Sequence, residues 1–291
     1  MVFLPLSAMK VSEFKTMIIT SLASIYEEGE AIAVANSYLA TKFDKALNQI
    51  QELRHIELED DQYQQFTSDL NKLASGIPLQ YVVNEAWFYD LKLFVNDKVL
   101  IPRPETEELV SLVLDDYEKT QNPLRILDIG TGSGCIPVLL GTKFPVAEIF
   151  ASDISEEALE IAKLNSRNHQ TNVSFLLDDI LNTKLSFTHQ LQVIISNPPY
   201  IAASESVEMQ SNVTEYEPEI ALFVPDSDPF IFYKAIAANA ASWLQPGGKL
   251  YLEINQRFGH ETAAIIRDAG FTSVKVIKDM SQNNRFIVAM R

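Results

Sequence analysis

LRILDIGTGSG, residues 124–134, is the segment from which the fold of this 291-residue chain is most readily inferred. Its apolar first half predicts a buried strand, and its glycines predict a tight turn after that strand. The apolar residues 136–140 predict a helix that begins there, since Pro137 is tolerated only in a first helical turn. A strand, a glycine loop and a helix in this order bring backbone N–H groups close to a nucleotide-like ligand. The spacing G-x-G-x-G is not the dinucleotide fingerprint G-x-G-x-x-G, and a ligand-free turn would explain this stretch by itself.

Two later strands end in acidic residues. The strand predicted over 147–152 ends at Asp153, and the strand predicted over Val173–Leu177 is followed by Asp178 and Asp179. Ligands of open α/β sheets lie at the carboxyl ends of the strands. We therefore expect Asp153 to accept hydrogen bonds from ribose hydroxyls and Asp179 to accept one from an adenine amino group.

A fourth strand, Val193–Ile195, leads into the tetrapeptide NPPY at residues 197–200. The two prolines fix φ and stiffen the backbone, and each disfavours helix at the residue before it. The Asn197 side-chain oxygen and the Pro198 carbonyl can accept both hydrogens of a planar –NH2 group, while Tyr200 covers its plane. Asn-Pro pairs also form plain turns. Three ligand-type loops at successive strand ends make a plain turn the poorer explanation here.

The rest of the chain shows a simple organisation. Residues 8–75 contain no proline and carry apolar residues at helical spacing, which predicts a small helical bundle. Residues 81–99 alternate in part and predict a β-hairpin. Residues 100–291 alternate between strand and helix patterns, which is typical of a doubly wound sheet. Residues 202–228, acidic and proline-containing, predict a loop over the active site. Later strands are predicted over 249–254, 274–277 and 286–290.

These motifs together resemble a known family. The loop GTGSG, Asp153, Asp179 and NPPY resemble class I S-adenosylmethionine-dependent methyltransferases. The segments GIPLQY at 76–81 and LIPRPETE at 100–107 narrow the resemblance to the peptide chain release factor glutamine methyltransferases of the HemK/PrmC type. The resemblance runs from about residue 76 to the C-terminus.

The resemblance implies a fold and a domain division. The fold is α/β, a doubly wound, seven-stranded Rossmann-like methyltransferase sheet whose last strand is antiparallel, with a small N-terminal helical bundle and a linking β-hairpin. The expected domains are a helical substrate-binding domain at 1–80, a β-hairpin linker at 81–99 and the S-adenosylmethionine-dependent methyltransferase domain at 100–291. Asn84 and Asp90 stand where the family usually has glycine, so both are expected at positive φ.

We expect the site residues to divide into two groups. Those that bind the cofactor are Asp128, Gly130, Thr131, Gly132, Ser133, Gly134, Asp153, Asp179, Ile180 and Asn197. Those expected to be catalytic are Asn197, Pro198, Pro199 and Tyr200. Arg103 and Glu105 are expected to organise the junction between the domains. Glu217 either orders the loop over the substrate or is structural.

Composition limits the class of protein. Apolar residues make up 47% and charged residues 21%, which is ordinary for a globular protein. The net charge of −16 disfavours extended contact with duplex nucleic acid, although a local basic patch can hide in that total. There is no apolar run of the roughly 18 residues that a membrane-spanning helix needs. The single cysteine, Cys135, suits a reducing compartment, and the histidines show no metal-ligand spacing. We expect a cytoplasmic monomer with a protein partner and no metal, membrane or stable nucleic acid.

The function that these features favour is methyl transfer from S-adenosylmethionine to the side-chain amide nitrogen of the glutamine in the GGQ motif of release factors. A glutamine methyltransferase of a ribosomal protein is a close alternative. An amino methyltransferase acting on adenine in nucleic acid shares NPPY but needs a basic base-flipping surface or a target-recognition domain, and neither is evident in the sequence. A non-catalytic S-adenosylmethionine-binding module is disfavoured by the intact NPPY.

Overall fold

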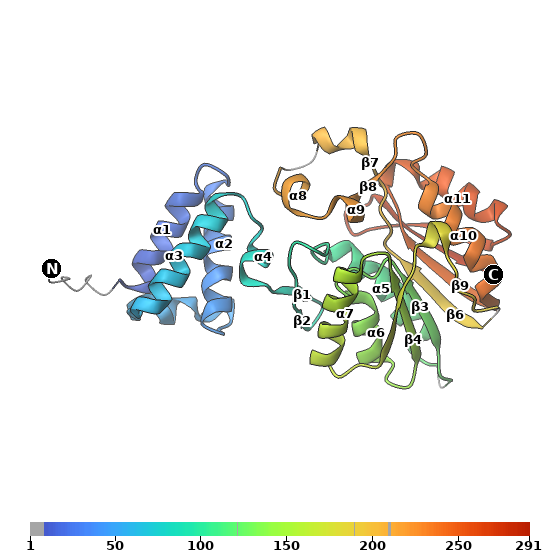
Figure 1. The fold of residues 1–291 in the computed structure, drawn as a ribbon, viewed down its shortest axis with the longest axis horizontal. Coiled ribbons are helices and arrows are strands. Elements are labelled where there is room, and N and C mark those ends of the chain that lie inside the picture. The colour runs from blue at the N-terminus through green and yellow to red at the C-terminus, as the bar shows by residue number, and fades with distance from the viewer. Residues whose placement is uncertain (1–8, 121, 189, 209–210) are drawn as a thin grey trace. The chain divides into compact units, whose positions relative to one another are not determined.

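The computed structural model describes residues 9–120, 122–188, 190–208 and 211–291. The chain divides into two compact units (Figure 1). The smaller unit holds Met1–Asn84 with Ser211–Tyr216, and the larger holds Glu85–Gln210 with Glu217–Arg291. The roles that the sequence assigns to separate domains stay predictions, and each unit is described by itself.

The smaller unit is helical. Its core is built by the faces of α1, α2 and α3, on which Phe14, Leu39 and Phe66 are buried. Spacing of three or four residues puts such side chains on one helix face, as the apolar pattern predicted. Its elements are α1 Val11–Leu22, α2 Glu28–Lys42, the 3₁₀ helix η1 Leu47–His55, α3 Asp60–Ala74, α4 Leu79–Val83 and α8 Ser211–Tyr216.

The larger unit is built on a seven-stranded sheet with the order β10-β11-β9-β6-β3-β4-β5. Its strands are β3 Arg125–Ile129, β4 Glu148–Asp153, β5 Val173–Leu177, β6 Leu191–Ser196, β9 Leu244–Glu253, β10 Thr272–Lys278 and β11 Asn284–Met290. Parallel pairing joins β9, β6, β3, β4 and β5 in that spatial order. Strand β11 runs antiparallel to both of its neighbours, β9 and β10. The predicted doubly wound sheet with an antiparallel last strand is confirmed.

Both faces of this sheet are covered (Figure 1). On β6, Val193 and Ile195 pack with α5 and α6, whereas Ile194 between them packs with α10 and α11. Successive side chains of a strand point to opposite faces, so a central strand buried on both sides is apolar throughout. The helices of the larger unit are α5 Pro104–Tyr117, α6 Cys135–Lys143, α7 Glu156–Asn168, α9 Glu219–Leu222, α10 Ile231–Trp243 and α11 Gly259–Asp268. Short 3₁₀ helices are η2 Ile180–Asn182, η3 Ala203–Glu208 and η4 Gln256–Phe258.

The hairpin within the predicted linker is shorter than its pattern suggested. Strands β1 Ala86–Phe88 and β2 Leu91–Leu93 form it, and α4 takes residues 81–83. Asn84 has φ 55° and ends α4, as expected for a residue that replaces glycine. The second expected position was wrong: Tyr89, not Asp90, has positive φ, at 52°. Tyr89 is held there because its N–H donates to the Glu107 carboxylate and its hydroxyl to the Glu107 carbonyl.

The segment 202–228, predicted as a loop, contains regular structure where it is described; residues 209–210 lie outside the described part. The short strands β7 Ile201–Ala202 and β8 Phe223–Val224 pair in parallel, and η3, α8 and α9 lie between them in the chain. Helix α8 belongs to the smaller unit, where the Tyr216 hydroxyl donates to the Ser75 carbonyl at 2.6 Å. Backbone pairing between residues far apart in the chain is not visible in a local pattern. No described helix has the length and apolar character to cross a membrane.

Candidate active site

A cavity of about 310 Å³ lies within the larger unit, at the carboxyl ends of β3, β4, β5 and β6. The structure brings most of the predicted site residues to its wall: Gly130, Gly132, Asp153, Asp179, Ile180, Asn197, Pro198 and Pro199. The predicted residues outside the cavity lining are Asp128, Thr131, Ser133, Gly134 and Tyr200. The charged side chains on its wall are Lys98, Asp153, Asp178 and Asp179, so the wall has a net negative charge.

The glycines of the loop after β3 have two different roles. A Cβ on Gly130 or Gly132 would meet no atom within 4 Å, so at both residues the backbone faces open space. A Cβ on Gly134, which has φ 79°, would lie 2.9 Å from the Ala162 Cβ of α7. Gly134 therefore serves the packing of α6 on α7, and the other two glycines leave backbone accessible at the cavity.

Asp153 ties this loop to the end of β4. One carboxylate oxygen accepts from the Gly132 N–H at 2.8 Å, and the other accepts from the Ser155 N–H at 2.9 Å. Burial raises the pKa of Asp153 above its ordinary value. Each carboxylate oxygen keeps a second lone pair that can accept a further hydrogen bond, and acceptance from ribose hydroxyls stays a prediction.

Asp179 lines the cavity at the end of β5, but its carboxylate is turned partly onto its own chain. It accepts from the Leu181 N–H at 2.9 Å and from the Asn182 side chain at 2.9 Å, and so caps the short helix η2. Ile180 follows it on the cavity wall. The remaining lone pairs of Asp179 are the acceptors available to an adenine amino group.

Asp128 lies beneath the glycine loop and is fully buried. Neither of its carboxylate oxygens forms a hydrogen bond within the described part of the chain, and the same holds for the Thr131 hydroxyl. Burial raises the pKa of Asp128 to about 7. Ser133 is buried as well, and its carbonyl accepts from the Asn165 side chain of α7 at 2.9 Å. Asp128, Thr131 and Ser133 are thus buried and lie outside the cavity lining.

Asn197 is the first member of a chain of hydrogen bonds. Its Nδ2 donates to the Thr106 Oγ1 at 3.0 Å, and the Thr106 hydroxyl donates to the Glu253 Oε2 at 2.8 Å. The Tyr200 hydroxyl donates to the other Glu253 oxygen at 3.0 Å. Thr106 and Glu253 are both buried, and burial raises the pKa of Glu253 to about 7. Both ends of NPPY are thus connected to one buried carboxyl group.

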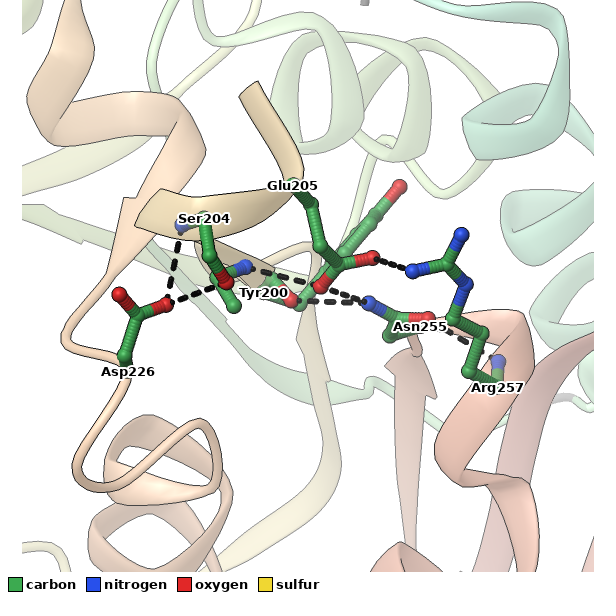
Figure 2. Close-up of polar contacts among 7 residues, drawn as sticks. Tyr200, Ser204, Glu205, Asp226, Asn255 and Arg257 are labelled. Atoms are coloured by element: carbon green, nitrogen blue, oxygen red, sulfur yellow. Dashed lines mark hydrogen bonds and ion pairs between the residues drawn. The ribbon is translucent and has the colours of Figure 1, made fainter. Parts of the chain in front are cut away.

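The backbone of NPPY is held by a second set of contacts (Figure 2). The Tyr200 carbonyl accepts from the Asn255 Nδ2 at 3.2 Å, and the same nitrogen donates to the Glu205 Oε1 at 3.2 Å. Arg257 donates to the other Glu205 oxygen at 3.0 Å, and Ser204 donates through its N–H and hydroxyl to Asp226. Residues just after β9 therefore fix where the chain goes after NPPY.

Arg103, whose side chain is partly exposed, forms an ion pair with the buried Glu217, in which an Arg103 Nη donates to Glu217 Oε1. The Ile101 N–H donates to the other Glu217 oxygen at 3.3 Å. Glu217 directly precedes Pro218, Ile220 and Ala221, which line the cavity. These contacts anchor Glu217 beside the residues that line the cavity, and both of its expected roles stay predictions.

Sequence reasoning did not assign roles to Thr106 and Glu253, although both lie in segments that it quoted. Glu253 ends an apolar strand, which is the signal that identified Asp153, so the same rule would have found it. Thr106 carries no signal by itself, because its partners are 91 and 147 residues away in the chain. The apolar wall from α10, Phe232 and Ile236, was not foreseen either.

The fold and the site define a methyltransferase. Residues 108–215 match the family model described as the methyltransferase small domain. A solved structure of a methyltransferase from Pyrococcus furiosus has a TM-score of 0.50 and 18% identity, covering 80% of this chain and 98% of that one, which shows the shared fold.

Curated relatives narrow the class. A release factor glutamine methyltransferase from Flavobacterium psychrophilum is 37% identical over 286 residues, which cover 96% of this chain and 98% of that protein. One from Bacteroides thetaiotaomicron is 43% identical over 220 residues, covering 76% of this chain and 78% of that protein. The chain belongs to the release factor glutamine methyltransferase family.

Proposed function

We propose that this enzyme transfers a methyl group from S-adenosylmethionine to the side-chain amide nitrogen of the glutamine in the GGQ motif of peptide chain release factors. The observation that carries the proposal is the orientation of Asn197 on the cavity wall. Because its Nδ2 donates to Thr106, its Oδ1 is the atom of this amide that remains available to a substrate –NH2 group. An acceptor at a rigid Pro-Pro corner suits an amide substrate.

The residues present fit the cofactor. The cavity wall carries more carboxylates than lysines, which suits a ligand with a sulfonium and an ammonium charge. Gly130 and Gly132 leave backbone open toward the ligand, and Asp153 and Asp179 keep lone pairs for the ribose and adenine groups. When bound, S-adenosylmethionine supplies an electrophilic methyl group on its sulfonium centre.

The residues of the site act by positioning and electrostatics. A carboxamide nitrogen is a weak nucleophile, because its lone pair is delocalised into the carbonyl. The Asn197 Oδ1 and the Pro198 carbonyl hold the two N–H groups and so direct the nitrogen, and alignment of this kind contributes roughly 7–11 kcal/mol. The same acceptors stabilise the positive charge that develops on the nitrogen in the transition state. Tyr200, which lies outside the cavity lining, supports this corner through the hydrogen bond from its hydroxyl to Glu253.

The partner is a release factor, and the smaller helical unit contributes to gripping it. The enzyme acts as a monomer, in the cytoplasm where translation terminates. The net charge of −16 suits a protein partner better than nucleic acid.

Single-turnover methyl transfer to a release factor, with the modified residue mapped by mass spectrometry, tests the proposal. Asn197→Ala removes one preorganised acceptor, so turnover should fall about a hundredfold to a thousandfold. Asn197→Asp keeps an acceptor and should lose less. Asn239→Ala is a matched control, since Asn239 bonds only within α10 in the described structure. Methylation of adenine in DNA or RNA, with none on glutamine, would refute the proposed function.

A further inference from the structure

The Asn197 side chain has two nearly isosteric orientations. Its amide oxygen and nitrogen are similar in size, so the hydrogen-bond partners decide which of them faces the cavity. On the protein side the partner is the Thr106 hydroxyl, at 3.0 Å. Asn197 is useful to an –NH2 substrate only when its oxygen is the atom that faces the substrate.

Thr106 can present either polarity to Asn197. A hydroxyl has one hydrogen to donate and lone pairs to accept with. When Glu253 is a carboxylate, it can only accept, so the Thr106 hydrogen points to it over 2.8 Å. Thr106 must then accept from Asn197, which presents its Nδ2 to Thr106. A protonated Glu253 can instead donate to Thr106, whose hydrogen is then free to turn toward Asn197 and draw the amide oxygen away from the substrate.

We propose that Thr106 and Glu253 are positioning residues that hold the Asn197 amide with its oxygen toward the substrate, and that the charge on Glu253 sets this polarity. The inference rests on the proposed function. Both residues are buried, with exposed fractions of 3% and 2%, so water does not compete for their hydrogen bonds.

The groups around Glu253 come from several elements. Thr106 and Tyr200 donate to its two oxygens, and the Tyr233 hydroxyl lies 3.5 Å from its backbone carbonyl. The other charged or titratable neighbours are Glu105, Cys135 and Arg285. Burial raises the pKa of Glu253 to about 7, while the hydrogen bonds and Arg285 oppose this shift. The carboxylate form, and with it the favourable Asn197 orientation, is therefore lost as the pH falls through this region.

Three Thr variants test the relay at pH 8 with saturating release factor and cofactor. Thr106→Val keeps the shape and removes the hydroxyl, so kcat should fall about tenfold, or about 1.4 kcal/mol. Cofactor affinity should be unchanged, because Thr106 is not part of the cavity wall. Thr106→Ser restores the hydroxyl and should recover most of the rate. Thr262→Val is a matched control, since Thr262 is also buried and its hydroxyl donates to the carbonyl of Phe258, the residue just before α11.

The pH profile separates positioning from packing. Wild-type kcat should decline as the pH falls below about 7, which gives its pH profile an acidic limb. The profile of Thr106→Val should lack this acidic limb, because no hydroxyl then connects Asn197 to Glu253. Glu253→Gln mimics the protonated acid, so its rate at pH 8 should match the low-pH rate of the wild type and vary little with pH. This variant carries the test if Thr106→Val does not fold.

The outcomes are distinguishable. A wild type that leaves the release-factor glutamine unmodified overturns the proposed function and this inference with it. A fully active wild type whose Thr106→Val or Glu253→Gln variant keeps both the rate and the acidic limb overturns the inference alone. Loss of rate with an unchanged acidic limb would show a packing role and would also overturn it.

Discussion

Adding one methyl group at Gly134 should destabilise the larger unit severely. Its φ of 79° is unfavourable for an alanine, by about 1–2 kcal/mol. The added Cβ would also lie 2.9 Å from the Cβ and 3.0 Å from the Cα of Ala162, and a helix backbone cannot move aside as a flexible side chain can. Overpacking of this kind typically adds about 1–3 kcal/mol. We therefore expect Gly134→Ala to lose about 2–5 kcal/mol of unfolding free energy.

Gly132→Ala is the matched comparison from the same loop. Its φ of 53° brings a similar backbone strain, but its Cβ would meet nothing within 4 Å. We expect a loss of only about 1–2 kcal/mol in stability. Its methyl group would occupy space on the cavity side, so affinity for S-adenosylmethionine should fall at least about tenfold, or about 1.4 kcal/mol.

Urea unfolding of the full-length chain and titration calorimetry with S-adenosylmethionine measure the two effects. Ala162→Gly should restore part of the stability of Gly134→Ala, because it removes the closest of the clashing atoms. Equal stabilities of the two glycine variants would refute the reasoning about the contact between α6 and α7. Unchanged cofactor affinity of a folded Gly132→Ala variant would refute the placement of the cofactor against this loop.

Three further predictions concern the cofactor, the pH and the smaller unit. Asp153→Ala removes charge-assisted bonds of about 1.5–3 kcal/mol each, so calorimetry should show at least about tenfold weaker cofactor binding; unchanged affinity in a folded variant would rule Asp153 out. Because burial raises the pKa of Asp128 to about 7, the native state binds a proton that the unfolded state has already released. The free energy of unfolding should therefore fall by up to about 4 kcal/mol as the pH rises from about 4 to about 7. Urea unfolding at pH 5 and pH 8 should show a smaller pH dependence for Asp128→Asn than for the wild type. An equal pH dependence in the two proteins would contradict the raised pKa of Asp128. A chain beginning at Glu85 should bind the cofactor but methylate intact release factor poorly, and a full rate would contradict a substrate-binding role for the helical unit.

The sequence by itself determined the features that depend on neighbours along the chain. Strand β5 spans Val173–Leu177, with the bounds that the pattern predicted. Ser155 caps α7 by accepting from the Ala158 N–H at 3.1 Å, which is an interaction within one helical turn. The order of the strand-end motifs also predicted the sheet, because parallel strands bring their carboxyl ends to one edge, and the family was predicted from the resemblance of those motifs.

Tertiary structure alone decided the features that depend on residues far apart in the chain. Gly134 packs against Ala162 on a neighbouring helix, and Tyr89 takes its positive φ because Glu107 holds it. The orientation of Asn197 depends on Thr106, which lies 91 residues away in the chain and donates its hydroxyl hydrogen to Glu253 on β9. Local pattern fixes which residues can accept or donate. The polarity of a buried hydrogen-bond chain is fixed only when folding brings all of its members together and removes water.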